Sequence, residues 1–318
     1  MRLMLAVVLT SFAVAVASAA PGPWRMAADA PVEVPSTRVA ATARRQAAAP
    51  TLAQVTEAFA ATRSGSPVPL SLEADQAAWL ADLRQAENEN PQPDLMFEGR
   101  LQTLLQIRAR DAGIRAMRVP GIEALSGDCI TAVLDGCLAS MGGHLKVRDG
   151  SVLYWQLQSG STEETGITDG IILLSAIDAA PGSLGPVAWS FEGARFDPPL
   201  LVSNSTEDGQ VYVAVPGVHA GSGSHNADLL FRWTPASDRP LTQIDNWSWR
   251  DALDERLPPG LGVWQGVRFD YRELMAVTPL WAPDDGNCCP SGGWAILGFE
   301  IVGDRLVLDT VTLRPGAR

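Results

Sequence analysis

The spacing of apolar residues changes near residue 119. Between residues 51 and 118 apolar side chains recur every three or four positions, as in Leu52, Val55 and Phe59, which is the period of an amphipathic helix. From residue 119 onward, short β-branched and aromatic runs alternate with glycine, proline and Asp-Gly turns, a pattern typical of strands. The chain therefore predicts an α+β protein: a helical region at 51–118 and a mainly antiparallel β region at 119–318.

Three helices are expected in the first region. Thr51 is placed to cap a helix over 51–63, and Ser71 to cap a second helix that ends before Pro91, because side-chain oxygens satisfy the free amides of a first helical turn. A third helix is expected over 95–112, where leucines and arginines are interleaved.

Strands are expected wherever apolar residues alternate between turn signals. The clearest are at 152–158, 170–174, 211–215, 229–234 and 294–302. The last two strands of the chain, 296–302 and 305–313, meet at Gly303-Asp304, and two such residues between alternating runs favour a tight hairpin.

Two stretches of the β region, 189–245 and 262–312, carry similar motifs in the same order. Phe-Glu-Gly-Ala-Arg-Phe-Asp from Phe191 matches Trp-Gln-Gly-Val-Arg-Phe-Asp from Trp264, and an acidic turn and an Ala-x-Leu-x-Phe strand follow in both. The matches predict two copies of one antiparallel meander. The alternative is that Gly-Asp turns and alternating strands resemble one another in unrelated β proteins.

The first 19 residues have the layout of a secretory signal peptide: Arg2, an apolar run over 3–16, and small residues at 17–19. The run is too short to span a bilayer. We expect cleavage near Ala19, a periplasmic or secreted mature chain without a membrane span and, since no cysteine follows, no lipid anchor at that site. Residues 20–50 are rich in alanine and proline, so a disordered linker is expected there.

Charge narrows the range of partners. Without residues 1–19 the chain carries 23 basic and 36 acidic residues, a net charge near −13. Surplus acid argues against binding nucleic acid or anionic membranes, whereas it would steer a basic partner toward the chain. Lys146 is the only lysine, which argues against Schiff-base chemistry.

The four cysteines are Cys129, Cys137, Cys288 and Cys289. An even number in an exported chain predicts two disulfides. Two of the three possible connectivities join the first pair to the second, and the third gives one local bridge and one vicinal bridge. Ring strain in a vicinal bridge favours the cross-linked forms, although the connectivity stays open.

No catalytic motif stands out. His219, His225 and Asp228 could meet at a metal, but loop histidines at this spacing are more often solvated, so neither a metal nor another cofactor is expected. A glycosidase would need two carboxylates at a defined separation. Candidates for that pair are Glu163, Glu164, Glu192, Asp254 and Glu300.

Tryptophans suggest a different role. Trp247 and Trp249 would share one face of a strand, because side chains alternate along strands. Such an aromatic surface could bind a glycan of the cell wall, whereas the structural alternative is that these tryptophans belong to the core.

Two segments resemble known families. Gln76, Trp79-Leu80, Arg84 and the basic leucine-rich run from Arg100 make residues 71–110 similar to the last half of the LprI-type lysozyme-inhibitor domain, a small secreted helical module. The resemblance implies helices and lysozyme inhibition, with Trp79 as the residue to test. That family carries disulfide cysteines around these helices, and this chain has no cysteine before Cys129.

The second resemblance is carried by Asp285-Gly286-Asn287-Cys288-Cys289-Pro290 and the alternating strand that follows. Residues 284–308 look like the tail of LppP/LprE-type bacterial envelope lipoproteins, without their lipid-anchor cysteine. Together these features predict a non-enzymatic envelope protein that binds a protein or glycan. The alternatives are a lysozyme inhibitor and a hydrolase that acts on the cell wall.

Overall fold

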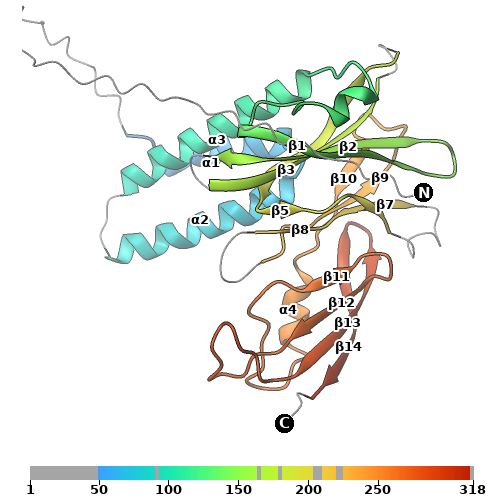
Figure 1. Ribbon diagram of the computed structural model, residues 1–318. Coiled ribbons are helices and arrows are strands. Elements are labelled where there is room, and N and C mark those ends of the chain that lie inside the picture. Colours follow the sequence, from blue (N-terminus) through green and yellow to red (C-terminus); the bar gives the residue numbers. More distant parts are fainter. Residues whose placement is uncertain are drawn as a thin grey trace, which may run out of the picture. The chain divides into compact units, whose positions relative to one another are not determined.

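The computed structural model describes residues 49–89, 93–162, 166–177, 181–202, 210–219 and 225–315. In this part of the chain three long helices precede three four-stranded antiparallel sheets (Figure 1). The α+β class expected from the sequence is confirmed. The expected signal peptide, and the linker up to residue 48, lie outside the described residues. None of the described helices is long and apolar enough to cross a membrane.

The helical region contains α1 (Leu52–Gly65), α2 (Pro69–Glu89) and α3 (Pro93–Ala116). Thr51 caps α1 as expected, in a reciprocal capping box with Gln54. The prediction that Ser71 caps α2 is wrong, because the helix begins two residues earlier. A proline fits a first helical position, where its missing N–H costs no hydrogen bond.

Three buried residues, one from each helix, form the centre of the helical cluster: Val55, Leu72 and Leu104. Beyond α3, the 3-10 helix η1 (Ile122–Ser126) leads into the β region.

The first sheet is a meander of β1 (Asp135–Lys146), β2 (Val152–Thr162), β3 (Gly166–Ala176) and β4 (Leu184–Gly193). One face of β3 packs with the end of α3 through Ile172 and Leu174. The other face packs with the second sheet through Ile171 and Leu173. Successive residues of β3 therefore face two different cores. Because both faces are buried, the strand is a continuous apolar run.

The second sheet has the order β10-β9-β7-β6. Its strands are β6 (Leu200–Leu201), β7 (Val211–Val215), β9 (Leu229–Trp233) and β10 (Leu241–Gln243). Two short strands near these in the sequence, β5 (Arg195–Phe196) and β8 (Gly217–Val218), pair with each other in a separate antiparallel ladder.

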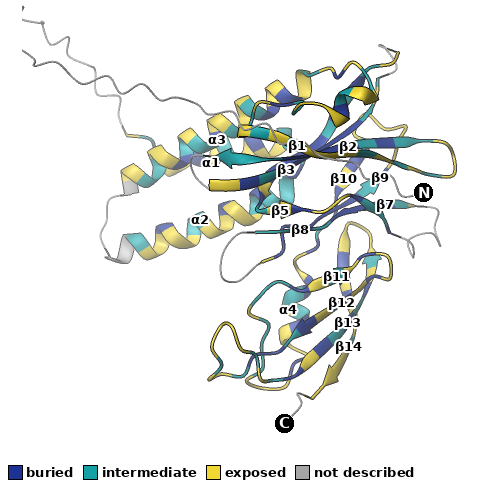
Figure 2. Cartoon of the chain, in the orientation of Figure 1, coloured by how far each residue is buried: buried dark blue, intermediate teal, exposed yellow. Residues whose placement is uncertain are grey.

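The third sheet has strands in chain order: β11 (Arg268–Asp270), β12 (Met275–Pro279), β13 (Trp294–Val302) and β14 (Arg305–Arg314). The hairpin expected at Gly303-Asp304 is confirmed: Val302 pairs with Arg305, and Gly303 has the left-handed φ of 61° that such a turn requires. Alternating buried and exposed residues along β13 show that one face of this sheet meets the core and the other meets solvent (Figure 2).

The stretches with matching motifs, 189–245 and 262–312, each contain an antiparallel meander. Phe231 and Phe299, which occupy matching motif positions, are both buried. Arg195-Phe196, however, lies in the two-stranded ladder, whereas Arg268-Phe269 lies in an edge strand of the third sheet. The duplication stays a prediction.

The cysteines form two local disulfides, Cys129–Cys137 and Cys288–Cys289. The cross-linked pairing favoured by the sequence argument is therefore wrong. Cys137 lies in β1 of the first sheet, whereas Cys288 lies in the loop leading to β13 of the third sheet, so each cysteine pairs with a partner close by in sequence.

A candidate ligand-binding cleft

A cleft of about 360 Å³ opens between α2, the end of β4 and the start of β9. Its lining residues come from five places in the sequence: Ser71, Ala74, Asp75, Ala78, Ser190, Glu192, His219, Ala227, Asp228, Leu229 and Trp247. A second cleft of about 540 Å³ lies between the start of α2 and the loop before β10. Only the first brings several carboxyl groups together, which is the common mark of a functional site.

Asp228 immediately precedes β9 and is 5% exposed. Its Oδ1 accepts a hydrogen bond from the Gly217 amide at 3.0 Å, and the Asn226 side chain and the buried Tyr271 hydroxyl also act as donors to this carboxylate. Burial raises the pKa of Asp228 to about 6, and the hydrogen bond from Gly217 and neighbouring side chains offset only part of that rise.

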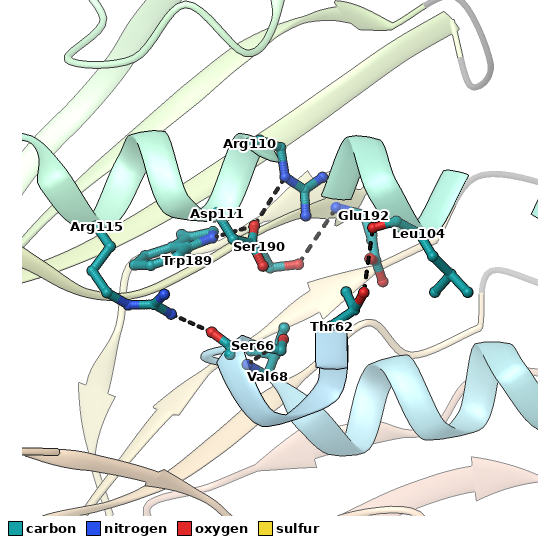
Figure 3. Close-up of polar contacts among 11 residues, drawn as sticks. Thr62, Ser66, Val68, Leu104, Arg110, Asp111, Arg115, Trp189, Ser190 and Glu192 are labelled. Atoms are coloured by element: carbon teal, nitrogen blue, oxygen red, sulfur yellow. Dashed lines mark hydrogen bonds and ion pairs between the residues drawn. The ribbon is translucent and has the colours of Figure 1, made fainter. Parts of the chain in front are cut away.

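The second carboxyl group is that of Glu192 on β4, which solvent reaches through the cleft although protein surrounds it. This desolvation raises the pKa of Glu192, and the guanidinium of Arg110 on α3 partly opposes the rise. Arg110 is itself bound to Asp111 at 3.1 Å, and Asp111 accepts the indole N–H of Trp189 at 2.9 Å (Figure 3).

Asp75 on α2 differs because its charge is paired. Arg100 of α3 contacts it at 2.6 Å and donates to Gln76 at 2.9 Å. The same guanidinium lies 5.8 Å from the ring centroid of half-buried Trp79, which packs against Phe97. Arg100 of α3 thus contacts both Gln76 and Trp79 of α2 and joins the two helices.

Trp247 contributes the aromatic wall of the cleft. Its side chain is 37% exposed, and the guanidinium of Arg250 lies 5.0 Å from its ring centroid. The expectation that Trp247 and Trp249 share a strand face is wrong, because Trp249 begins the short helix α4 (Trp249–Asp254). Trp249 is 2% exposed and packs edge-on against Phe269 and Phe299, so it has no surface for a ligand.

The turn before α4 depends on Asp245. Its carboxylate accepts from the backbone amides of Trp247 and Ser248, each at 3.0 Å. Partial burial acts to raise the pKa of Asp245, but these hydrogen bonds outweigh burial and lower it. A carboxylate that satisfies two successive amides favours a helical turn over an extended strand.

Hydrogen bonds from neighbouring polar side chains fix the backbone around Asp228. Asn246 donates to the backbone carbonyl of Asp228 at 3.0 Å, and Asn226 exchanges two hydrogen bonds with the backbone of Val267. Arg250 donates to Asn226 at 3.1 Å. These contacts fix the backbone at Asp228 and join Asn226 to Val267, which precedes the third sheet.

The other residues singled out in the sequence lie elsewhere. His219 lines the cleft, but no group of three or more potential ligands in the described ranges could hold a metal ion. Asp254 and Glu300 are exposed outside the cleft, and Glu163 and Glu164 lie outside the described residues. Cys288 and Cys289 are exposed in a loop whose turn is closed by Asp285, which accepts from Ala282 and Ser291.

Sequence reasoning missed Asp75 and Ser190, and considered Asp228 only as a metal ligand. Asp75 follows helical spacing like any solvated helix residue, so nothing in its local pattern distinguishes it. The one signal was an acidic residue at the start of an otherwise apolar strand, Asp228 before Leu229 and Leu230.

Comparisons with known proteins leave the chain unassigned. No protein-family model matches it, and no curated protein matches it significantly. Among solved structures, it shows a distant likeness to the β-1,2-mannobiose phosphorylase from Listeria innocua in complex with β-1,2-mannobiose. The TM-score is 0.20 at 11% identity, with 55% of this chain and 44% of that chain covered.

Proposed function

We propose that this chain is a bacterial envelope protein, periplasmic or secreted, that binds a glycan in the cleft between α2, β4 and β9 without converting it. The observation that carries the proposal is the composition of the cleft. Trp247, which is 37% exposed, lines the same cleft as three carboxyl groups and the hydroxyls of Ser71 and Ser190. A sugar ring offers an apolar face for an aromatic side chain and hydroxyl groups for such polar partners.

The cleft also has a suitable size. Its volume of about 360 Å³ lies at the small end of the range for ligand sites. We therefore infer that it takes one or two sugar units of a longer glycan.

Replacing Trp247 by alanine tests the proposal. We expect binding of soluble cell-wall glycan fragments, followed by titration calorimetry, to weaken by about tenfold or more, because the aromatic wall is lost. Trp264→Ala is the matched control, since Trp264 is 39% exposed and lies outside the cleft. Equal weakening in both variants, or none in Trp247→Ala, would contradict the proposal.

One observation favours a second candidate function, hydrolysis of a cell-wall glycan. Asp228 and Glu192 line one cleft, and burial raises the pKa of Asp228, as in the general acid of a glycosidase, which also needs a second carboxylate that stays ionised. We expect no new reducing ends when the protein is incubated with cell-wall glycan. Release of reducing ends that is lost in both Glu192→Gln and Asp228→Asn would replace the binding proposal by the enzymatic one.

A further inference from the structure

The outer face of the third sheet is largely apolar although it meets solvent. Residues of β12 and β13 alternate between the core and this face, so every second side chain points outward. An antiparallel sheet face in contact with water normally carries polar residues. Here several outward residues are apolar and more than a third exposed: Met275, Val277, Trp294 and Val307.

The strand register joins these residues into one surface. Val277 of β12 lies opposite Ile296 of β13, and Pro279 lies opposite Trp294. Residues that face each other across two strands lie about 5 Å apart, so these side chains and that of Met275 are contiguous. We call these five residues the outer patch. A contiguous apolar surface of this kind is the mark of an interaction site.

Charged residues around the outer patch are separated by sign along the strands. The two arginines lie in the rows of Val277 and Trp294, whereas the two acids lie in the row of Met275 and in the row beyond it. All four are exposed, and none forms an ion pair within the described ranges: Arg268, Asp270, Glu300 and Arg314. Further along β14, Arg305 is already paired with Asp245.

A surface with one positive and one negative end is complementary to a second copy of itself. A two-fold axis that crosses the strands between the positive and the negative rows turns each end of one copy onto the opposite end of the other. Arg268 then faces Asp270 of the other copy, and Arg314 lies near its Glu300. The apolar rows meet between these charges, at the spacing of about 10 Å that packed sheets adopt.

We propose that the outer patch is the interface of a homodimer, in which two copies pack face to face through their third sheets with their strands running in opposite directions. A partner of a single charge sign, such as an anionic lipid surface, is repelled by one end of the patch, whereas a second copy satisfies both ends. The outer patch shares no residue with the glycan cleft, so this inference is independent of the proposed glycan binding.

Charge exchange tests the pairing across the axis. Sedimentation equilibrium of the purified protein should show a reversible dimer, and its Kd should rise by about tenfold or more in Arg268→Glu, because two carboxylates then face each other. Adding Asp270→Arg to that variant exchanges the two charges and should restore the Kd to within about threefold. Circular dichroism checks folding, since Asp270 also accepts from the Arg272 amide.

A charge at the centre of the outer patch tests the apolar contact. Val277→Arg should raise the Kd by about a hundredfold or more, because it buries an unpaired guanidinium. Ile167→Arg, at an 80% exposed position of β3, and Arg148→Glu, in the exposed turn between β1 and β2, are the matched controls. Both should leave the Kd unchanged.

Three results would overturn the proposal. The first is a protein that stays monomeric up to about 100 μM, including one that instead binds vesicles of anionic lipid. The second is a dimer that Val277→Arg leaves intact, which would place the interface elsewhere. The third is a loss of affinity in Arg268→Glu that Asp270→Arg does not restore, because the opposed charges are what selects a second copy as the partner.

Discussion

Burial of the Asp228 carboxyl group gives the folded state an uncommon dependence on pH. Its folded pKa of about 6 lies above the ordinary value of 3.8. Between these values the folded state binds more protons than the unfolded state, so this group's stabilising contribution is full below 3.8 and is lost as pH rises through 6. At neutral pH the ionised group costs about 3 kcal/mol of the free energy of unfolding.

Asp228→Asn should therefore stabilise the protein at neutral pH. Asparagine keeps the acceptor for the Gly217 amide and removes the buried charge. We expect the free energy of unfolding in urea to rise by about 1–3 kcal/mol near pH 7.5, and this gain to vanish near pH 4.

Asp309→Asn, an exposed change in β14, is the control and should alter stability by less than about 0.5 kcal/mol at either pH. A gain in Asp228→Asn that is equal at both pH values would show that the buried charge is not its cause. A stabilised variant with weaker ligand binding would mean that the cleft sacrifices stability for function.

The two disulfides differ in what they constrain. Cys129–Cys137 spans eight positions and ties the segment before β1 to the strand itself. Cys288–Cys289 joins neighbours in sequence, so it closes almost no loop in the unfolded chain. In the chain-entropy account, stabilisation grows with the length of the closed loop.

Replacing each cysteine pair by alanines should show that difference. Loss of the first disulfide should lower the free energy of unfolding by about 2–3 kcal/mol, and loss of the vicinal one by less than about 1 kcal/mol. Thermal unfolding of both double variants measures it. Equal losses would contradict the loop-entropy account.

A further expectation is that the unreduced protein shows no alkylatable thiol by mass spectrometry.

Elements whose signals are local could be predicted, and those that depend on distant contacts could not. The cap at Thr51 and the turn at Gly303 each rest on a few adjacent residues. The helix α4 is an exception, because its signal is local and was missed: the Asp245 carboxylate accepts from the amides of Trp247 and Ser248. The cleft joins Asp75 to Asp228, which lie far apart in sequence, so its existence could not be inferred from either segment.

At the scale of the whole molecule, net charge bears on the lysozyme-inhibitor hypothesis. The acidic chain should attract a basic enzyme at low salt, and screening should weaken that attraction at high salt. Within residues 71–110, Trp79 of α2 contacts Phe97 and Arg100 of α3. These contacts give the partly buried Trp79 a structural role.

A turbidity assay of lysozyme on cell walls, run at two salt concentrations, separates specific inhibition from charge capture. We expect inhibition, if any, to disappear at high salt, because the observed contacts of Trp79 are internal. Inhibition that persists at high salt and is lost in a folded Trp79→Ala protein would instead establish the inhibitor function.

The second sheet has a consequence for how the molecule unfolds. It buries Phe231 in the core shared with the first sheet and Leu230 in the core shared with the third. Both faces of the second sheet are apolar, so removing either neighbouring sheet would expose one of them to water. Residues 119–318 should therefore melt in a single cooperative transition, and a fragment cut between the sheets should aggregate instead of folding.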